Sequence, residues 1–270
     1  MPRFKLTIEY AGTRYSGWQI QKNARTIQGE IDRAVRTVTA RKDFELYGAG
    51  RTDAGVHAIA QVAHLDVSTT LPPDTLRRRI NDELPADINI LAAAPVPHRF
   101  HARHDAAGRR YLYQIATRRT AFAKQYVWWV KDPLAISRMR DAARAFVGMR
   151  DFKSFTALDP GDPGDDDTAG ASAPSTLVLV DRLDIAEDGG LILIGIEGSH
   201  FLWKMVRRIV GVLAEVGRGG AEPGVAAQWL RESSTAPARL TAPPSGLFLE
   251  RVYYKDDPRD APLRPATPLA

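Results

Sequence analysis

The chain has 270 residues, of which 44% are hydrophobic, enough to bury the core of one large domain or of two smaller ones. It contains no cysteine, which excludes disulfides, thiolate catalysis and cysteine-ligated zinc and fits a reducing compartment. The net charge of +5 is modest, and the sequence contains no signal-peptide pattern and no apolar run that would span a membrane. We therefore expect a cytoplasmic protein.

The first part of the chain predicts the element order β-α-β-β-α-β. Apolar and polar residues alternate strictly over 4–10, which is typical of a half-buried strand. Thr26 is placed to cap a helix with an apolar stripe, and Asp74 to cap a second helix that Pro85 ends. Further strands are predicted at 44–49, 59–67 and 87–95.

The second part repeats that order. Tyr111, Tyr113 and Ile115 alternate on a strand, and a short aromatic stretch follows at 126–130. The remaining predicted elements, in chain order, are a helix from Asp132-Pro133 to Gly148, strands at 176–186 and 191–197, an apolar-striped helix from Leu202 to Leu213, a short helix at 224–232 and a strand at 247–254.

Two such patterns predict an α+β fold of two ferredoxin-like halves, 1–105 and 106–255. The two antiparallel sheets would lie side by side with helices on one face, and a central cleft would take a large substrate. The segment 159–175 holds five aspartates, three prolines and three glycines, which predicts a flexible acidic loop. The Pro-rich tail, 256–270, is predicted to be disordered.

Basic and aromatic residues are interleaved from His98 to Thr120. This segment holds six arginines and three histidines against one acid, Asp105. Such a mixture suits phosphate contact combined with base stacking, so the central cleft is predicted to bind RNA. The alternative is an ordinary solvated basic face. The acidic loop would repel RNA and is not expected in the substrate path.

The most informative segment is 48–58, a Gly-rich polar loop between two predicted strands. Asp53 lies at its centre. An aspartate in such a loop is often a turn former, because its carboxylate bonds nearby backbone amides. Arg51, two residues away, favours an ionised carboxylate, which suits a nucleophile or a base. We therefore predict Asp53 as the catalytic nucleophile.

Two further side chains are candidates for the same site. Arg207 lies on the polar face of the helix after His200 and is placed to pair with an acid or a phosphate, whereas Arg208 on that face is predicted to be solvated. Tyr111 is either a core aromatic or a ring that stacks on a base. The histidines at spacing three, beginning at His98, have arginines between them, so no metal site is predicted.

At this point the residues resemble the tRNA pseudouridine synthase A family. The loop Gly50-Arg51-Thr52-Asp53-Ala54-Gly55-Val56-His57-Ala58 is similar to that family's catalytic signature. Further similar motifs occur in the family's order over roughly residues 4 to 254, at 10–19, 25–30, 100–103, 110–113, 151–155, 198–207 and 242–247. The stretch from Arg118 to Lys124 matches only loosely.

The resemblance implies an isomerase that converts uridine to pseudouridine in the anticodon stem-loop of tRNA, at positions 38, 39 and 40. It implies a homodimer that holds the tRNA and no cofactor. By position, Asp53 matches the nucleophile, Tyr111 the active-site tyrosine and Arg207 the active-site arginine. The residues predicted to bind the substrate are Tyr111, Arg51, Thr52, His57, Arg103 and Arg110.

The chemistry leaves alternatives open. The carboxylate of Asp53 can attack the sugar at C1′, attack the ring at C6, or remove a proton from the sugar. Two other classes of protein fit parts of the pattern: a non-catalytic RNA-binding module, which needs no poised acid, and an RNA N-glycosidase, which releases free uracil. The sequence-based hypothesis is that Asp53, Tyr111 and Arg207 converge on one point.

Overall fold

The computed structural model describes residues 1–156 and 175–269 of the chain. They form two compact units. Unit 1 comprises Met1–Leu112 and Pro244–Pro262, and unit 2 comprises Tyr113–Pro243 and Leu263–Ala270. The chain therefore leaves unit 1 after Leu112 and returns to it at Pro244. Among the described residues, no helix has the length and apolar character needed to cross a membrane.

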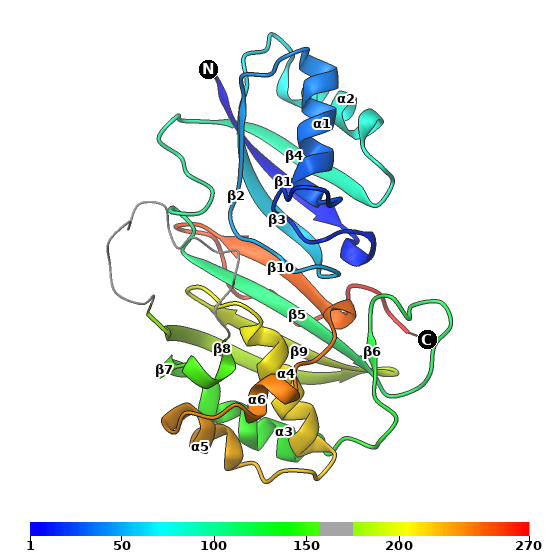
Figure 1. The fold of residues 1–270 in the computed structure, drawn as a ribbon, viewed down its shortest axis with the longest axis vertical. Helices are drawn as coiled ribbons and strands as arrows, with labels where there is room; N and C mark the ends of the chain where they lie inside the picture. The colour runs from blue at the N-terminus through cyan, green and yellow to red at the C-terminus, as the bar shows by residue number, and fades with distance from the viewer. Residues whose placement is uncertain (157–174, 270) are drawn as a thin grey trace. The chain divides into compact units, whose positions relative to one another are not determined.

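Unit 1 is a mostly antiparallel sheet with two helices on one face (Figure 1). Its elements are β1 (Arg3–Tyr10), α1 (Ile27–Thr39), β2 (Glu45–Gly48), β3 (His57–Asp66), α2 (Pro73–Glu83), β4 (Ile88–Val96) and β10 (Leu247–Tyr253). The strands follow the order β4-β1-β3-β10, and β2 also pairs with β3. β10 runs parallel to β3, whereas β1 is antiparallel to both of its neighbours.

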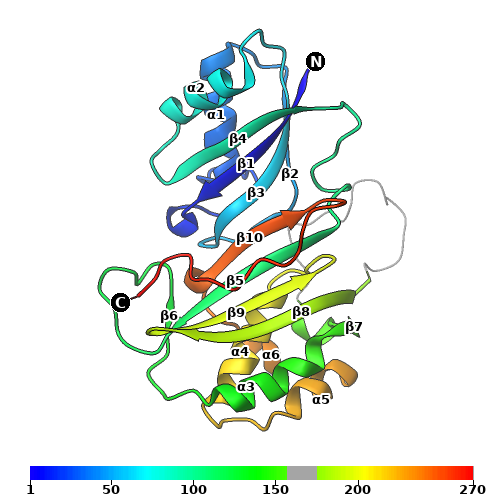
Figure 2. The ribbon, with the colours of Figure 1, turned by 180° about the vertical axis from the view of Figure 1, so that it is seen from behind.

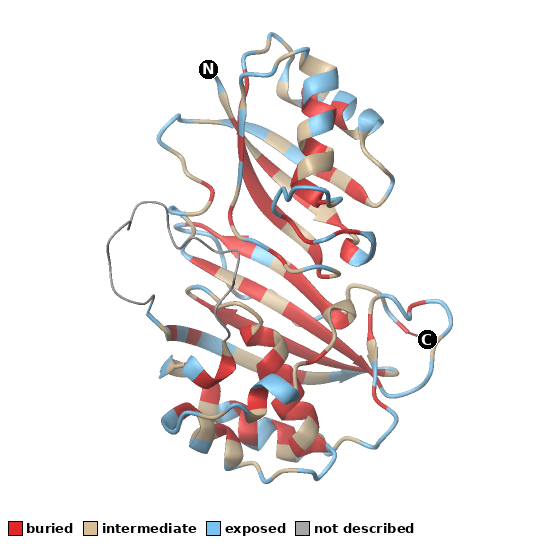
Figure 3. Cartoon of the chain, in the orientation of Figure 1, coloured by how far each residue is buried: buried red, intermediate tan, exposed pale blue. Residues whose placement is uncertain are grey.

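The core of unit 1 lies between that sheet and α1 and α2. Along β1, alternate side chains are buried, as the sequence pattern predicts. The helix α1 begins where the Thr26 hydroxyl accepts a hydrogen bond from the Gly29 N–H, and it buries Ile27 and Ile31 against the sheet. Figure 3 shows buried residues along α1 and along the strands of unit 1. This core makes unit 1 a firm support for the loop between β2 and β3.

Unit 2 is built in the same manner, with its helices on one face of antiparallel strands (Figure 2). β5 (Gly108–Ala116) begins in unit 1 and ends in unit 2. The elements that follow it are β6 (Trp128–Trp129), α3 (Ile136–Ala143), β7 (Gly148–Asp151), β8 (Leu177–Asp188), β9 (Leu191–Gly198), α4 (Met205–Gly217), α5 (Val225–Arg231) and α6 (Ala236–Arg239).

The helix predicted from Leu202 to Leu213 is α4, which begins at Met205 and ends at Gly217. The ends of α2 and α3 also differ from the prediction. Asp74 does not cap α2, which begins at Pro73 after Pro72, so Asp74 lies in the first turn and pairs with Arg77. The helix predicted from Asp132-Pro133 to Gly148 is α3 alone, which begins at Ile136 and ends at Ala143. A 3-10 turn follows, and Gly148 with φ of +94° opens the unpredicted strand β7. Pro133 lies in the loop that precedes α3.

The acidic segment predicted at 159–175 lies outside the described residues except for Ser175. The tail contains no helix or strand over 256–269. Two of its backbone groups nevertheless bond to buried side chains: the Ala261 carbonyl accepts from Arg110 Nη1 at 2.6 Å, and the Ala266 N–H donates to Gln114 Oε1 at 2.7 Å.

Candidate active site

Asp53 lies in the loop of residues 49–56 that joins β2 to β3, here called the Asp53 loop. Its side chain is partly exposed, as a group that reacts with a substrate must be, and the neighbouring Arg51 is exposed. The loop contains no helix or strand, so its shape depends on groups outside it.

The backbone of the loop is bonded to the segment 12–18, which follows β1. The Trp18 N–H donates to the Thr52 carbonyl at 3.0 Å, and the Gly55 N–H donates to the Tyr15 carbonyl at 3.3 Å. These bonds lie on both sides of Asp53. The backbone that carries Asp53 is therefore restrained on both sides, which limits the positions open to its side chain.

Two glycines are required by this arrangement. Gly17 has φ of +95°, and a Cβ there would lie 2.5 Å from the Thr52 carbonyl oxygen. Gly55 has φ of +79°, and a Cβ there would lie 2.9 Å from Cγ of Pro244. A side chain is therefore strained at both positions and also collides. By contrast, a Cβ on Gly50 meets nothing within 4 Å.

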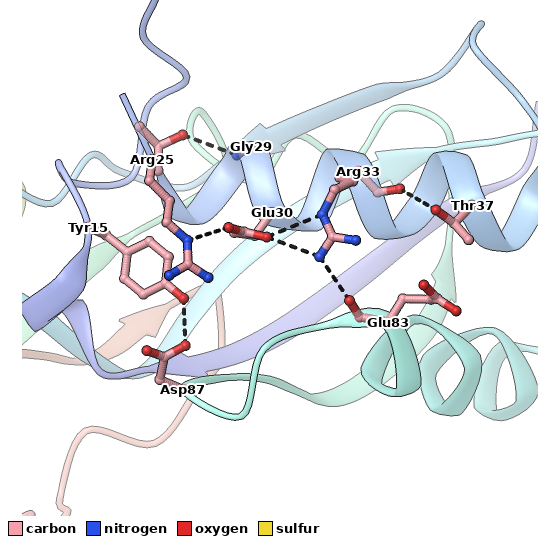
Figure 4. Close-up of polar contacts among 9 residues, drawn as sticks. Tyr15, Arg25, Gly29, Glu30, Arg33, Thr37, Glu83 and Asp87 are labelled. Atoms are coloured by element: carbon pink, nitrogen blue, oxygen red, sulfur yellow. Dashed lines mark hydrogen bonds and ion pairs between the residues drawn. The ribbon is translucent and has the colours of Figure 1, made fainter. Parts of the chain in front are cut away.

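A polar network holds the segment 12–18 against the start of α1 (Figure 4). The Tyr15 hydroxyl donates to Asp87 Oδ1 at 2.5 Å, and the Arg25 guanidinium lies 4.9 Å from the centre of the Tyr15 ring. Glu30 accepts from Arg25 Nε at 2.5 Å and from Arg33 Nη2 at 3.1 Å. Burial, together with the Asp87 carboxylate, raises the pKa of Tyr15, so its hydroxyl remains a donor at neutral pH.

Beneath the loop lie Tyr10, Gln61 and Arg109, polar residues for which the sequence predicted no role in the site. The hydroxyls of Tyr10 and Thr52 share a buried hydrogen bond of 2.8 Å. Gln61, fully buried on β3, donates from Nε2 to the Gly50 carbonyl at 2.9 Å. Arg109 donates from Nη2 to the Ala49 carbonyl at 3.0 Å. The sequence held one signal of these buried polar groups: Tyr10, whose hydroxyl comes at the end of the apolar face of β1.

Tyr111, on the unit 1 part of β5, is electrostatically coupled to Asp53. Burial raises the pKa of Tyr111 to about 12, with the Arg109 guanidinium opposing that rise and the Asp53 carboxylate adding to it. The phenol is therefore protonated at neutral pH and able to donate a hydrogen bond. Asp53 and Tyr111, two of the three predicted catalytic residues, thus lie in the same unit and within electrostatic range of each other.

The predicted substrate-binding residues lie in different surroundings. Thr52, His57 and Arg110 are buried, and each bonds to the protein. His57 Nδ1 accepts from the Gly12 N–H at 3.0 Å, and Arg110 forms an ion pair of 2.9 Å with Glu250. Their contacts support the loop and β5. Arg51 is exposed, and Arg103, like Tyr111, is partly exposed.

Arg207 lies in unit 2, in the first turn of α4. Its Nε donates to the Ala242 carbonyl at 2.7 Å, and its own carbonyl accepts from the Ala242 N–H at 3.0 Å. The fully buried Tyr113 is close enough for the Arg207 charge to influence its pKa, which burial raises well above the ordinary value. Its hydroxyl donates to the Pro243 carbonyl at 2.8 Å. Arg207 is therefore held at a defined position within unit 2.

The prediction for Arg208 was wrong. The residue is 7% exposed, and its Nη1 donates to the Thr156 carbonyl. Burial lowers the pKa of Arg208. A helical pattern identifies the polar side chains of a face but does not reveal that another segment covers part of it.

Histidines gather near one end of β3. The rings of His64 and His101 have centroids 4.7 Å apart, and those of His101 and His104 are 4.1 Å apart. Burial, with a smaller contribution from Arg3, lowers the pKa of His64 to about 4. Within residues 1–156 and 175–269, no group of three or more His, Cys, Asp or Glu side chains is arranged to hold a metal ion.

Comparisons with known proteins agree with the sequence resemblance. The family described as tRNA pseudouridine synthase matches residues 6–105 and 142–255. Three similar curated proteins carry the name tRNA pseudouridine synthase A. The Rhodopseudomonas palustris protein is 41% identical over 258 residues, covering 94% of this chain and 100% of its own length. The Agrobacterium fabrum protein is 38% identical over 261 residues, covering 95% and 94%. The Thermoanaerobacter sp. protein is 38% identical over 256 residues, covering 94% and 100%.

The chain therefore belongs to the tRNA pseudouridine synthase family. By that membership it is an enzyme, an isomerase of the class that acts on tRNA.

Proposed function

We propose that this protein converts uridine to pseudouridine in the anticodon stem-loop of tRNA, at positions 38, 39 and 40, with Asp53 as the nucleophile. The observation that carries this proposal is the geometry of the Asp53 loop. A partly exposed carboxylate lies on a backbone bonded on both sides, and Tyr111 is close enough to be coupled to it electrostatically. A catalytic group held in this way loses little energy to reorganisation when the substrate arrives.

The reaction exchanges one bond to the sugar for another. The bond from C1′ to N1 breaks, the uracil turns, and C1′ bonds to C5. The hydrogen on C5 leaves as a proton, and N1 gains one, so the atoms balance without an oxidant or a reductant. Attack by Asp53 at C1′, attack at C6, and removal of a sugar proton all fit this balance.

We infer the roles of the other site residues from their burial and their contacts. Tyr111 stacks on the extruded uracil and donates from its protonated phenol. Arg207 pairs with a phosphate of the bound RNA. Arg51 and Arg103 contact the RNA backbone, since both have exposed surface. The buried Thr52, His57 and Arg110 act by holding the loop and β5 in place.

The proposal extends to the architecture. We assign two ferredoxin-like halves, a central RNA-binding cleft, a homodimer and a cytoplasmic location. The element order of the first 96 residues, β1-α1-β2-β3-α2-β4, with the sheet order β4-β1-β3-β2, supports the ferredoxin-like assignment for unit 1. Sedimentation of the purified protein tests the homodimer, and a monomer at working concentration would remove it.

The test follows tritium released from unmodified tRNA labelled at C5 of uracil. The wild-type protein is expected to release tritium, and Asp53→Asn to release none, because an amide is neither a nucleophile nor a base at neutral pH. Asp82→Asn is the matched control, since Asp82 is an exposed carboxylate on α2, and it should release tritium at the wild-type rate.

Three results would change the proposal. Normal release by Asp53→Asn would remove Asp53 from its role. No release by the wild-type protein from any tRNA would remove the activity. Free uracil detected by chromatography would redirect the assignment to an N-glycosidase. Mapping the modified positions in the product tests the choice of the anticodon stem-loop.

A further inference from the structure

A basic and aromatic pocket lies in unit 2, apart from the elements that hold Asp53. It is lined by the loop after β5 and by the end of the chain, and its volume is about 490 Å³. The lining residues that matter here are Arg118, Arg119, Phe122, Tyr126, Pro268 and Leu269. We call it the 118–126 pocket. The volume falls within the range of about 300–1,000 Å³ that is typical of ligand sites.

The loop that forms one wall of the pocket is positively charged. Residues 117–131 contain two arginines, two lysines and no acidic residue. None of the described residues that line the pocket is acidic. Such a surface is complementary to a polyanion.

Aromatic side chains are presented to solvent beside these cations. Phe122 is 98% exposed and Trp129 is 43% exposed. The guanidinium of Arg119 lies over the Trp129 ring, 5.7 Å from its centroid. Burial of an apolar ring is favourable in water, so a fully exposed ring gains most from a partner that covers it. Exposed aromatic rings beside cationic side chains typically bind nucleic acids, because the bases stack on the rings.

The walls of the pocket are held together from within. The fully buried Gln114 donates from Nε2 to the Tyr126 carbonyl at 3.0 Å and to Thr267 Oγ1 at 3.1 Å. Its Oε1 accepts from the Ala266 N–H at 2.7 Å. One buried amide thus joins the loop to the chain end, which gives the pocket a defined shape before any ligand binds.

The pocket lies outside the stretches of the chain that the family match covers. The family match covers 6–105 and 142–255, so both walls lie outside it. A second copy of the chain is a poorer occupant than RNA. In a two-fold dimer the same patch meets itself, which would bring the cations of the loop against their own copies.

We propose that the 118–126 pocket is a second RNA-binding site, in which Arg119 contacts a phosphodiester and Phe122 stacks on an unpaired base of the tRNA. The inference rests on the proposed function insofar as the RNA is the tRNA substrate.

The test measures binding of a full-length tRNA transcript to the full chain over a range of salt concentrations. Phe122→Ala is expected to weaken binding between about fivefold and a hundredfold, the loss of one base stack, and to leave the salt dependence unchanged. Arg119→Gln is expected to lower the slope of log affinity against log salt by about 0.7–0.9, the loss of one phosphate contact. The control carries Met149→Ala and Arg231→Gln, which remove an exposed apolar side chain and an exposed arginine elsewhere in unit 2, and should bind like the wild type.

The outcomes separate this proposal from the proposed function. If both pocket variants bind RNA with the wild-type affinity and salt dependence, and the protein releases tritium normally, the second RNA-binding site is ruled out while the proposed activity stands. A change in sedimentation of the Phe122→Ala variant with unchanged RNA affinity would assign the surface to a protein interface instead. Weakened binding in the control equal to that in the variants would also overturn it. Failure of the wild type to release tritium concerns the proposed function alone.

Discussion

Replacing Gly17 with alanine tests what holds the Asp53 loop in place. A non-glycine residue at φ of +95° costs about 1–3 kcal/mol in backbone strain. The new Cβ would lie 2.5 Å from the Thr52 carbonyl oxygen, so the loop must move by roughly half an ångström, about the tolerance of a catalytic geometry. The expected result is a loss of about 2 kcal/mol in the free energy of unfolding.

The same displacement acts on the reaction rate. A misplacement approaching 1 Å costs on the order of a hundredfold, so the single-turnover rate of tritium release by Gly17→Ala should fall by about ten- to a hundredfold. The melting temperature should fall by roughly 4–8 °C. Calorimetry and rapid-quench tritium release measure the two effects on one preparation.

Gly50→Ala is the matched control within the same loop. A Cβ there meets nothing within 4 Å, and Gly50 is not among the residues with positive φ. Its melting temperature should stay within about 2 °C of the wild type or rise slightly, because alanine narrows the unfolded ensemble. If Gly17→Ala melts and reacts like Gly50→Ala, the contact with residue 17 does not position the loop.

Three further predictions concern buried polar groups. Burial lowers the pKa of His64 to about 4, against 6.5 in the unfolded chain. The contribution of neutral His64 to the free energy of unfolding is therefore complete above pH 6.5 and falls by up to about 3 kcal/mol as the pH drops toward 4. His64→Gln should reduce this dependence of the free energy of unfolding on pH, measured by denaturation at each pH. Tyr10→Phe removes the buried bond to Thr52 and should cost about 1–2 kcal/mol by urea denaturation. Arg110→Met strands the Glu250 carboxylate and should cost about 3–5 kcal/mol, whereas Arg110→Met combined with Glu250→Leu should cost less.

Each of these has an outcome that contradicts it. An unchanged slope between pH 6.5 and 4 in His64→Gln would mean that another group carries the dependence, and the exposed His200→Gln should match the wild type throughout. Tyr10→Phe with wild-type stability would show that water replaces the lost bond. A double variant as unstable as Arg110→Met alone would show that the arginine acts by packing rather than by pairing.

Some elements were predictable because their signals are local. The alternation over Phe4 to Tyr10 defines a strand, and Thr26 defines the start of α1, since period and capping depend only on neighbouring residues. The loop around Asp53 was recognisable for the same reason, from its composition between two apolar runs. Family motifs in order along the chain extended these signals to an activity.

Other features depend on contacts between distant residues. Nothing local in β10 indicates that the chain returns to lie parallel to β3, and nothing in the helix pattern of α4 reveals that Arg208 is covered at Thr156. The bonds that fix the Asp53 loop come from the segment 12–18, about 35 to 40 residues earlier.

The sequence by itself determined most of the local elements and the family, and it made Asp53 the candidate nucleophile. The tertiary structure decided which polar groups are buried and what holds the Asp53 loop, in part the contact with Gly17. The reason is physical: period and propensity are properties of adjacent residues, whereas burial is a property of whichever distant segment packs against them.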